Sequence, residues 1–313
     1  MGAGTRRQEN AAMTALAAQR APGRALAWCL ALRPWSFTIS LAPILAGTSL
    51  AILDGHGARL GLALAALAAS ILIHAGTNLQ NDVGDFRRGA DGAGRIGPPR
   101  ATTEGWLPAS HVQTAVVLCF GLAFIPGAYL VAYGGWPILA IGLASVAAGA
   151  VYTAGPRPVA YSGWGETFVI LFFGLVAVGG MYYLHTGTIG AAAILAGVAI
   201  GLLAAAVLVV NNLRDIDSDR RIGKNTLAVR CGVRFTLVEY GFLLFAPFAL
   251  VLALTQHEGR FGLLAPLLLL PWALRLYLRV RRTPSGAWLN GALASTAKLG
   301  LLFAILLSFG GLA

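Results

Sequence analysis

The residues best suited to chemistry lie in a polar stretch that ends a long apolar run. From Asn78 to Asp91 the sequence reads NLQNDVGDFRRGAD, and it contains three carboxylates, Asp82, Asp85 and Asp91. If the apolar run is a helix, Asn78, Asp82 and Asp85 stand at positions i, i+4 and i+7 and share one face. Charged residues make up only 11% of the chain, so three acids in one short segment indicate a functional site.

A second acidic cluster repeats this arrangement far downstream. Asn211, Asp215 and Asp219 stand at i, i+4 and i+8, again at the end of a long apolar run. Half of the twelve acidic residues of the chain lie in the two clusters. A functional interpretation must therefore explain two carboxylate clusters in an otherwise apolar protein.

The chemistry of these clusters favours a metal ion and a diphosphate. Carboxylates are unfavourable at the C-terminal end of a helix, because that end already carries about half a negative charge. The available ligands are Asp and Asn oxygens, with no Cys or His at ligand spacing, which favours Mg²⁺ over zinc or copper. Basic residues threaded through both clusters would pair with phosphates: Arg87, Arg88, Arg214, Arg220, Arg221, Lys224 and Arg230.

The rest of the chain has the composition of a polytopic membrane protein. It is 57% hydrophobic with a mean hydropathy of +0.73. A spanning helix needs about 20 mostly apolar residues, and nine such windows are present: 34–53, 60–81, 111–133, 136–153, 166–184, 188–210, 235–255, 260–278 and 288–310. We therefore expect an all-α bundle of nine transmembrane helices over residues 33–313, with residues 1–32 as a flexible tail.

The basic residues predict the orientation of this bundle. If the N-terminus is cytoplasmic, most of the 23 lysines and arginines fall in cytoplasmic segments. Both acidic clusters then lie at the cytoplasmic face of a membrane of the bacterial inner-membrane type. The net charge of +11 follows from this bias and does not indicate nucleic-acid binding. The three widely separated cysteines predict neither a disulfide nor a metal site.

The same face is expected to carry three further substrate-binding candidates, Tyr152, Arg157 and Tyr161. A diphosphate site at the mouth of an apolar cavity suggests a lipid diphosphate whose tail lies among the helices. If that lipid is allylic, magnesium would stabilise the departing diphosphate, and the cavity would keep water away from the carbocation. The aromatic face of Tyr152 or of the phenylalanine-rich fifth window could hold the cation.

The two acidic clusters resemble the two aspartate-rich motifs of the UbiA superfamily of intramembrane prenyltransferases. Other segments are similar to its branch that prenylates 1,4-dihydroxy-2-naphthoate in menaquinone synthesis: Gly76–Asn78, Gly97–Arg100, Gly155–Tyr161, Gly165–Glu166, Phe172–Val178 and Gly223–Arg230. The resemblance runs from about Arg33 to Leu307. The distance from Asp82 to Asp91 is wider than in the ubiquinone branch, which favours the naphthoate branch.

The resemblance implies a nine-helix bundle that binds two Mg²⁺ ions through the motif aspartates. A polyprenyl diphosphate would be the donor and 1,4-dihydroxy-2-naphthoate the acceptor, which would lose its carboxylate as carbon dioxide and give demethylmenaquinone. We expect the residues of the motifs to divide the work as follows: Asp82, Asp85, Asp215 and Asp219 hold the metal with help from Asp91, Asn78, Asn81 and Asn211 complete the shell, and Arg214, Lys224 and Arg230 neutralise the leaving group.

Other interpretations remain open at this point. Within the superfamily, acceptors such as 4-hydroxybenzoate or homogentisate are possible. An ion-coupled transporter would also contain intramembrane acids, but its charges should be distributed through the bilayer, and here they gather at one face. A phosphatidyltransferase of the CDP-alcohol type would show one compact acidic motif, which the sequence lacks.

Overall fold

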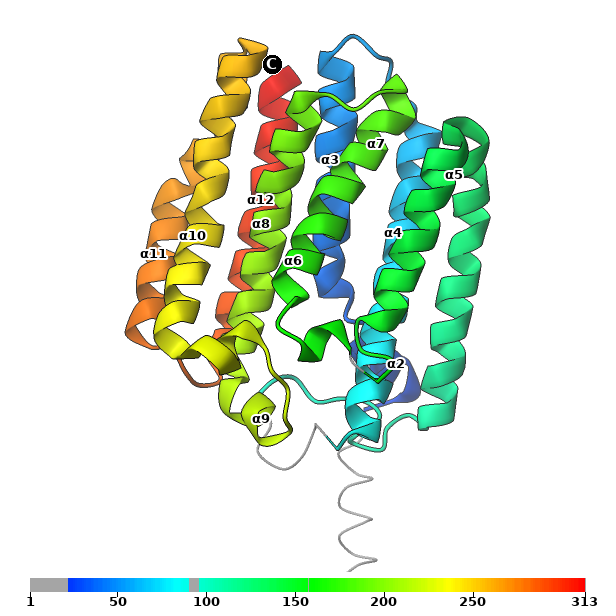
Figure 1. The fold of residues 1–313 in the computed structure, drawn as a ribbon, viewed down its shortest axis with the longest axis vertical. Helices are drawn as coiled ribbons and strands as arrows, with labels where there is room; N and C mark the ends of the chain where they lie inside the picture. Colours follow the sequence, from blue (N-terminus) through cyan, green and yellow to red (C-terminus); the bar gives the residue numbers. More distant parts are fainter. Residues whose placement is uncertain (1–21, 90–95, 157, 313) are drawn as a thin grey trace, which may run out of the picture.

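The computed structural model describes residues 22–89, 96–156 and 158–312, and every regular element within these ranges is a helix (Figure 1). In chain order the elements are α2 (Arg24–Leu32), η1 (Pro34–Phe37), α3 (Thr38–Leu53), α4 (Leu60–Arg87), α5 (Ala109–Val151), η2 (Val159–Tyr161), α6 (Gly165–Val169), η3 (Ile170–Val176), α7 (Ala177–Thr186), α8 (Ala191–Arg214), α9 (Ile216–Arg221), α10 (Leu227–Glu258), η4 (Phe261–Leu269), α11 (Leu270–Arg282) and α12 (Leu289–Leu312).

The expected nine spans are confirmed within the described residues. Eight helical stretches are long and apolar enough to cross a membrane, and the longest, α5, covers 43 residues. This stretch reverses direction at Gly135, whose φ of 67° and ψ of −154° are not helical, so α5 forms the two antiparallel helices seen in Figure 1. A positive φ costs glycine little, and Pro137 begins the return helix. Counted as two, α5 brings the described spans to nine.

Helix α8 lies at the centre of the bundle and packs against α10, α12, η3 and α3. Its contact with η3, a π-helical turn in the fifth span, is a backbone-to-backbone approach. A Cβ added to Gly174 would lie 2.4 Å from the Gly197 carbonyl oxygen and 2.7 Å from the Gly201 Cα. Small residues at these positions permit the close helix packing that membrane bundles use.

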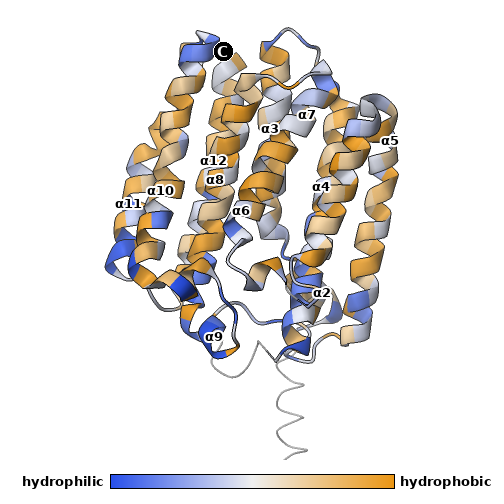
Figure 2. Cartoon of the chain, in the orientation of Figure 1, coloured by the Kyte–Doolittle hydropathy of each residue, from blue (hydrophilic) through white to orange (hydrophobic). Residues whose placement is uncertain are grey.

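The outer surface of the bundle is apolar along its spans (Figure 2). Large apolar side chains such as Trp136 and Phe261 point outward, as expected where lipid replaces water. Polar residues gather at the end of the bundle where α2 and α9 lie (Figure 2). The chain is therefore an integral membrane protein with one markedly polar end.

The segment before residue 33 is not all tail. Helix α2 begins at Arg24, and its Ala27 and Ala31 are buried against Leu79 and Val83 of α4. The boundary expected at residue 33 thus divides a helix from the bundle on which it packs, because the alanines of α2 fit closely against α4. Residues 1–21 lie outside the described part of the chain.

Candidate active site

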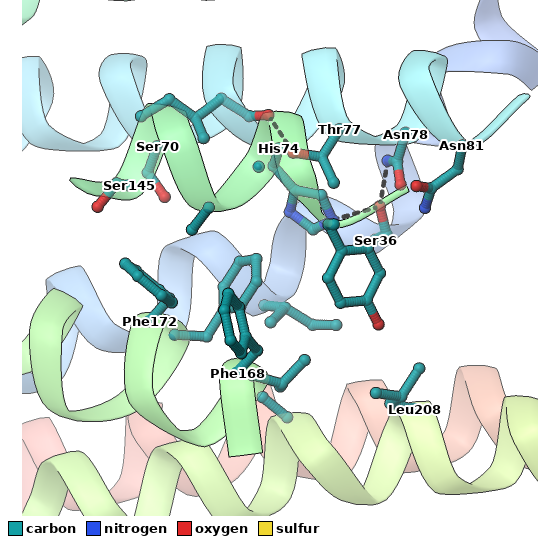
Figure 3. Close-up of a pocket in the computed structure, with 18 of the residues that line it drawn as sticks. Ser36, Ser70, His74, Thr77, Asn78, Asn81, Ser145, Phe168, Phe172 and Leu208 are labelled. Carbon is teal, nitrogen blue, oxygen red and sulfur yellow. Dashed lines mark hydrogen bonds between the residues drawn. The ribbon is translucent and has the colours of Figure 1, made fainter. Parts of the chain in front are cut away.

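A cavity of about 1110 Å³ runs between α4 and α5 on one side and α6, η3 and α8 on the other. The small and polar residues of α4 that line it include Ser70, His74 and Thr77, which point toward the cavity in Figure 3. Phe168 and Phe172 face them from the fifth span. The cavity therefore has one polar wall, one aromatic wall, and an apolar body.

Both acidic clusters reach the polar end of this cavity. Asp85 lines it from α4, and Asp215 and Asp219 line it from the end of α8 and from α9. Asn211 and Lys224 line the same end. We expected four aspartates, Asp82, Asp85, Asp215 and Asp219, to hold the metal. Three of these four line one common cavity.

In the first cluster, Asp85 is the aspartate that faces the cavity. Its carboxylate accepts hydrogen bonds from Arg100 at 2.9 Å and from the Tyr161 hydroxyl at 2.9 Å. Arg100 lies in the segment after the first motif, and its pairing with Asp85 is buried. Tyr161 lies near the second motif, since the ammonium of Lys224 stands 5.6 Å from its ring centroid. Asp85 is thus a junction between three segments of the chain.

Asp82, which we expected to be a metal ligand, does not line the cavity. It is fully buried, and its carboxylate accepts hydrogen bonds from the backbone amides of Ala101 at 3.2 Å and Thr102 at 3.3 Å. Helical spacing placed Asp82 on roughly the same side as Asp85, but the segment that follows the motif folds back and covers it. Asp82 therefore anchors the segment that supplies Arg100.

In the second cluster, Asp215 is held by its sequence neighbour. Arg214 donates from Nε to one carboxylate oxygen at 2.8 Å and from a terminal nitrogen to the other at 2.5 Å. The same guanidinium also donates to Asn211 at 2.8 Å and to Asn290 at 2.7 Å. Such bidentate pairs fix geometry as well as charge, so Arg214 orients Asp215 and Asn211 at the cavity wall.

Asp219 pairs more loosely, with the Lys224 ammonium 3.4 Å from its Oδ2 atom. Burial raises the pKa of the Asp219 carboxyl to about 6, and the nearby carboxylates of Asp215 and Asp85 add to this rise, against the lowering effect of Lys224. The negative potential of both clusters therefore converges on Asp219. Added positive charge at this place would stabilise the ionised form.

The donor set at the polar end suits a hard cation. The Oδ1 atom of Asn81 and the Oδ2 atom of Asp219 are buried and accept no hydrogen bond within the described residues. In the same part of the chain, no three Asp, Glu, His or Cys side chains come together as a metal site. An ion would thus be held by few carboxylates, with amide and phosphate oxygens completing its shell. This is how Mg²⁺ is usually bound.

Three of the expected substrate-binding cations lie off the cavity wall. Arg87 is exposed at the end of α4. Arg88 donates to the carbonyl oxygens of Thr153 and Gly155 at 2.8 and 2.9 Å. Arg230 donates to the carbonyl oxygen of Ser162 at 2.8 Å. For these residues the sequence correctly indicated the end of the bundle but not the direction of the side chain.

Two further expected site residues, Tyr152 and Asn78, line the cavity. Tyr152 lines the cavity, and burial together with the carboxylates of Glu166 and Asp85 raises the pKa of its phenol. Asn78 also lines it, but its amide donates to the Leu32 carbonyl oxygen at 3.0 Å and to the Ser36 hydroxyl at 3.1 Å. Asp91 and Arg157 lie outside the residues that the structure describes.

Comparison with known families decides what kind of protein this is. The model of the UbiA prenyltransferase family matches residues 40–293, a range that contains both acidic clusters and most of the cavity wall. The chain belongs to the UbiA prenyltransferase family. The resemblance of the two motifs is thereby confirmed.

Several bacterial relatives of this UbiA-family chain carry the same name. The 1,4-dihydroxy-2-naphthoate octaprenyltransferase of Haemophilus influenzae is 34% identical over 296 residues, which cover 90% of this chain and 94% of that protein. The enzyme of the same name from Escherichia coli is 41% identical over 215 residues, 67% of this chain and 70% of its own.

The UbiA fold is also seen in solved structures. A UbiA homolog from Archaeoglobus fulgidus, solved with DMAPP and Mg²⁺ bound, superposes with a TM-score of 0.64 at 16% identity. The match covers 90% of this chain and 99% of that one. At this level of identity the likeness establishes the fold.

One residue of this UbiA-family cavity was not among the expected site residues. Glu166 lies on the cavity wall, is 5% exposed, and accepts a hydrogen bond from the Asn212 side chain at 2.7 Å. The available signal was a lone acid at the start of an apolar window, which indicates a function or a partner. From the sequence, Gly165–Glu166 was one of the segments of resemblance, but we assigned no role to Glu166.

Proposed function

We propose that this UbiA-family protein transfers a polyprenyl group from an allylic polyprenyl diphosphate to 1,4-dihydroxy-2-naphthoate. The acceptor loses its carboxylate as carbon dioxide, diphosphate is released, and the product is demethylmenaquinone. The names of two relatives support this choice of acceptor, since both are 1,4-dihydroxy-2-naphthoate octaprenyltransferases. Their matches cover 90% and 67% of this chain.

The observation that carries the proposal is a single cavity that joins carboxylates at a polar end to an apolar interior. Asp85, Asp215 and Asp219 lie at the polar end, and the body passes Phe124, Leu143 and other apolar side chains of the spans. At about 1110 Å³ the cavity is larger than the roughly 300–1,000 Å³ of a common small-molecule pocket. A diphosphate head and a long apolar tail require such a combination.

Mg²⁺ is the cofactor that we propose for this site. Each ion would be held by one or two of the carboxylates of Asp85, Asp215 and Asp219, together with the oxygens of Asn81 and Asn211, while Asp91 remains a candidate. When bound, Mg²⁺ acts as a Lewis acid that stabilises negative charge on the departing diphosphate. Asp82 supports this shell indirectly, because it fixes the segment that carries Arg100.

The chain's own residues supply the rest. Lys224 and Arg214 lie at the cavity wall beside the acids, where they neutralise charge on the diphosphate, and Arg221 extends this basic rim. The aromatic wall at Phe168 and Phe172 excludes water and faces the cationic carbon, a contact worth about 2 kcal/mol when desolvated. Binding, orientation and water exclusion thus come from different walls of one cavity.

We further propose that the polar end faces the cytoplasm and that the protein resides in a bacterial inner membrane. The concentration of basic residues in segments at that end supports this orientation.

A turnover assay tests the proposal. The detergent-purified protein receives Mg²⁺, geranylgeranyl diphosphate, and either 1,4-dihydroxy-2-naphthoate or 4-hydroxybenzoate, and products are identified by mass spectrometry. We expect a prenylated naphthoquinol without the carboxyl group, and we expect a chelator to abolish it. Product from 4-hydroxybenzoate alone would overturn the acceptor, and absence of any prenylated product would overturn the reaction.

A further inference from the structure

A buried carboxylate on the cavity wall has no task in the proposed diphosphate site. Glu166 stands in the first turn of α6, immediately before the π-helical turn η3, and lines the cavity. Local π-helical geometry in a helix is frequent at functional sites. Uncompensated acids at membrane depth are costly and usually serve a function.

Glu166 is held in place by one neighbour and approached by another. The Asn212 amide donates to its Oε1 atom at 2.7 Å. The Tyr152 hydroxyl lies beside the preceding backbone, since a Cβ added to Gly165 would be 3.3 Å from the Tyr152 hydroxyl oxygen. The carboxylate is thus fixed from α8, and the Tyr152 hydroxyl lies near the backbone of the same helical turn.

The position of Glu166 relates to both acidic clusters. Burial raises the pKa of the Tyr152 phenol, and the carboxylates of Glu166 and Asp85 both add to this rise, so both lie near this side chain. Asn212, which holds Glu166, follows Asn211 at the polar end. The carboxylate therefore lies near the diphosphate end of the cavity but outside the proposed metal shell.

We propose that Glu166 accepts the hydroxyl proton of the aromatic acceptor during prenyl transfer. This inference rests on the proposed function and deepens it. A hydroxylated ring between the polar α4 wall and the phenylalanines would reach the Glu166 carboxylate at the polar end. Asn212 orients the carboxylate through its Oε1 atom, so that the carboxylate is held at the cavity wall where the acceptor would lie.

The proton and electron balance closes without a further reagent. The acceptor O–H bond breaks, its proton moves to a Glu166 oxygen, and the electron pair enters the ring. The ring carbon that bears the carboxylate forms a bond to C1 of the prenyl group, while the C1–O bond breaks and diphosphate leaves with the electron pair of that C1–O bond. Carbon dioxide leaves with its bonding electrons kept by the ring, and the proton on Glu166 returns to the product.

Glu166→Gln separates this role from that of a simple brace between α6 and α8. Glutamine keeps an oxygen for the Asn212 amide but cannot take the proton. We expect kcat to fall by at least about 100-fold, with KM for the donor within about twofold of the wild type. A variant that keeps more than about half of the wild-type kcat would overturn the inference.

A second readout comes from the acidity of the acceptor. If Glu166→Gln is slow because proton removal is impaired, a ring-fluorinated dihydroxynaphthoate with a more acidic hydroxyl should reduce the loss of kcat in this variant by about tenfold. An equal deficit with both acceptors would contradict the proposal. The matched control is Glu258→Gln, because Glu258 is a partly buried acid at the C-terminal end of α10 that does not line this cavity among the described residues; its kcat should be unchanged.

Two further measurements distinguish failure of this inference from misfolding of a variant and from failure of the proposed function. Magnesium-dependent binding of geranylgeranyl thiolodiphosphate reports whether each variant retains its donor site. If Glu166→Gln does not accumulate, Glu166→Ala with added formate replaces it, and formate should restore at least about tenfold in turnover; no restoration would overturn the inference. If the wild type makes no prenylated naphthoquinol, the proposed function itself fails.

Discussion

The two acidic clusters look alike in sequence but are built differently. In the first, Asp82 accepts hydrogen bonds from two backbone amides, and Asp85 pairs with an arginine 15 residues further along the chain. In the second, Asp215 pairs with its direct neighbour Arg214, and Asp219 pairs with Lys224 five residues on. The first cluster depends on a segment that folds back over it, whereas the second is largely self-contained.

This difference teaches that an aspartate's place in a motif does not define its task. Among the described residues, each cluster contains one acid that does not line the cavity. Asp82 is fully buried beneath the loop, and the Asp217 side chain is 84% exposed. The three acids that do face the cavity each have a basic partner within the chain: Arg100, Arg214 and Lys224. These cations limit repulsion among the acids and can also interact with a diphosphate.

The largest expected effect is on the acids that face the cavity. Asp85→Asn and Asp219→Asn should each lower turnover by on the order of 100- to 1000-fold, because each removes a charge that would hold the metal. Steady-state turnover of the purified variants measures this. A pair of variants with near-native turnover would refute the joint role of the two clusters.

The next effect concerns stability in the second cluster. Arg214→Gln leaves Asp215 buried without its bidentate partner, and breaking a buried pair costs about 3–5 kcal/mol. The thermal midpoint in detergent should fall by roughly 5–10 °C. Arg220→Gln is the matched control, since the Arg220–Asp217 pair is exposed and its atoms lie 3.7 Å apart. Equal shifts in both variants would show that Arg214 is not a structural partner.

A smaller effect is expected for Asp82. In Asp82→Asn one of the two backbone amides of Ala101 and Thr102 loses its acceptor, which costs about 1–3 kcal/mol. The thermal midpoint should fall by a few degrees, and turnover should fall less than about tenfold. Thermal unfolding and turnover on one preparation test this. A stable variant with more than about 100-fold lower turnover would show that Asp82 acts as a metal ligand.

The smallest effect is expected for Asp217. This acid is solvated, and within the described part of the chain it pairs with Arg220 alone. Exposed pairs contribute little to stability. Asp217→Asn should therefore change neither the thermal midpoint nor turnover by a measurable amount. A clear loss of turnover would show that α9 moves Asp217 toward the cavity in the working enzyme.

Much of the architecture was predictable because it depends on local properties. Nine apolar windows indicated nine spans, and the structure places a span in each of them. The two motifs were predictable as partners because both end apolar runs on the same side. The tyrosine at 161 was expected at this face, and its hydroxyl does bond to Asp85.

The roles of individual residues were less predictable because they depend on contacts distant in sequence. The folding of Ala101 and Thr102 onto Asp82 could not be derived from helical spacing. Arg88 and Arg230 were expected to bind substrate, but their guanidinium groups donate to carbonyl oxygens of the segment at 153–162. Glu166 belonged to a segment of resemblance but was given no role, because one acid near the end of an apolar window resembles an ordinary interfacial charge.

The most direct test of the account compares Asp82→Asn with Asp85→Asn in one binding experiment. Each purified variant is titrated with geranylgeranyl thiolodiphosphate with Mg²⁺ and with a chelator. We predict that Asp82→Asn keeps magnesium-dependent binding and that Asp85→Asn loses it. Loss of that binding in Asp82→Asn, with Asp85→Asn unaffected, would contradict the division of labour within the first cluster.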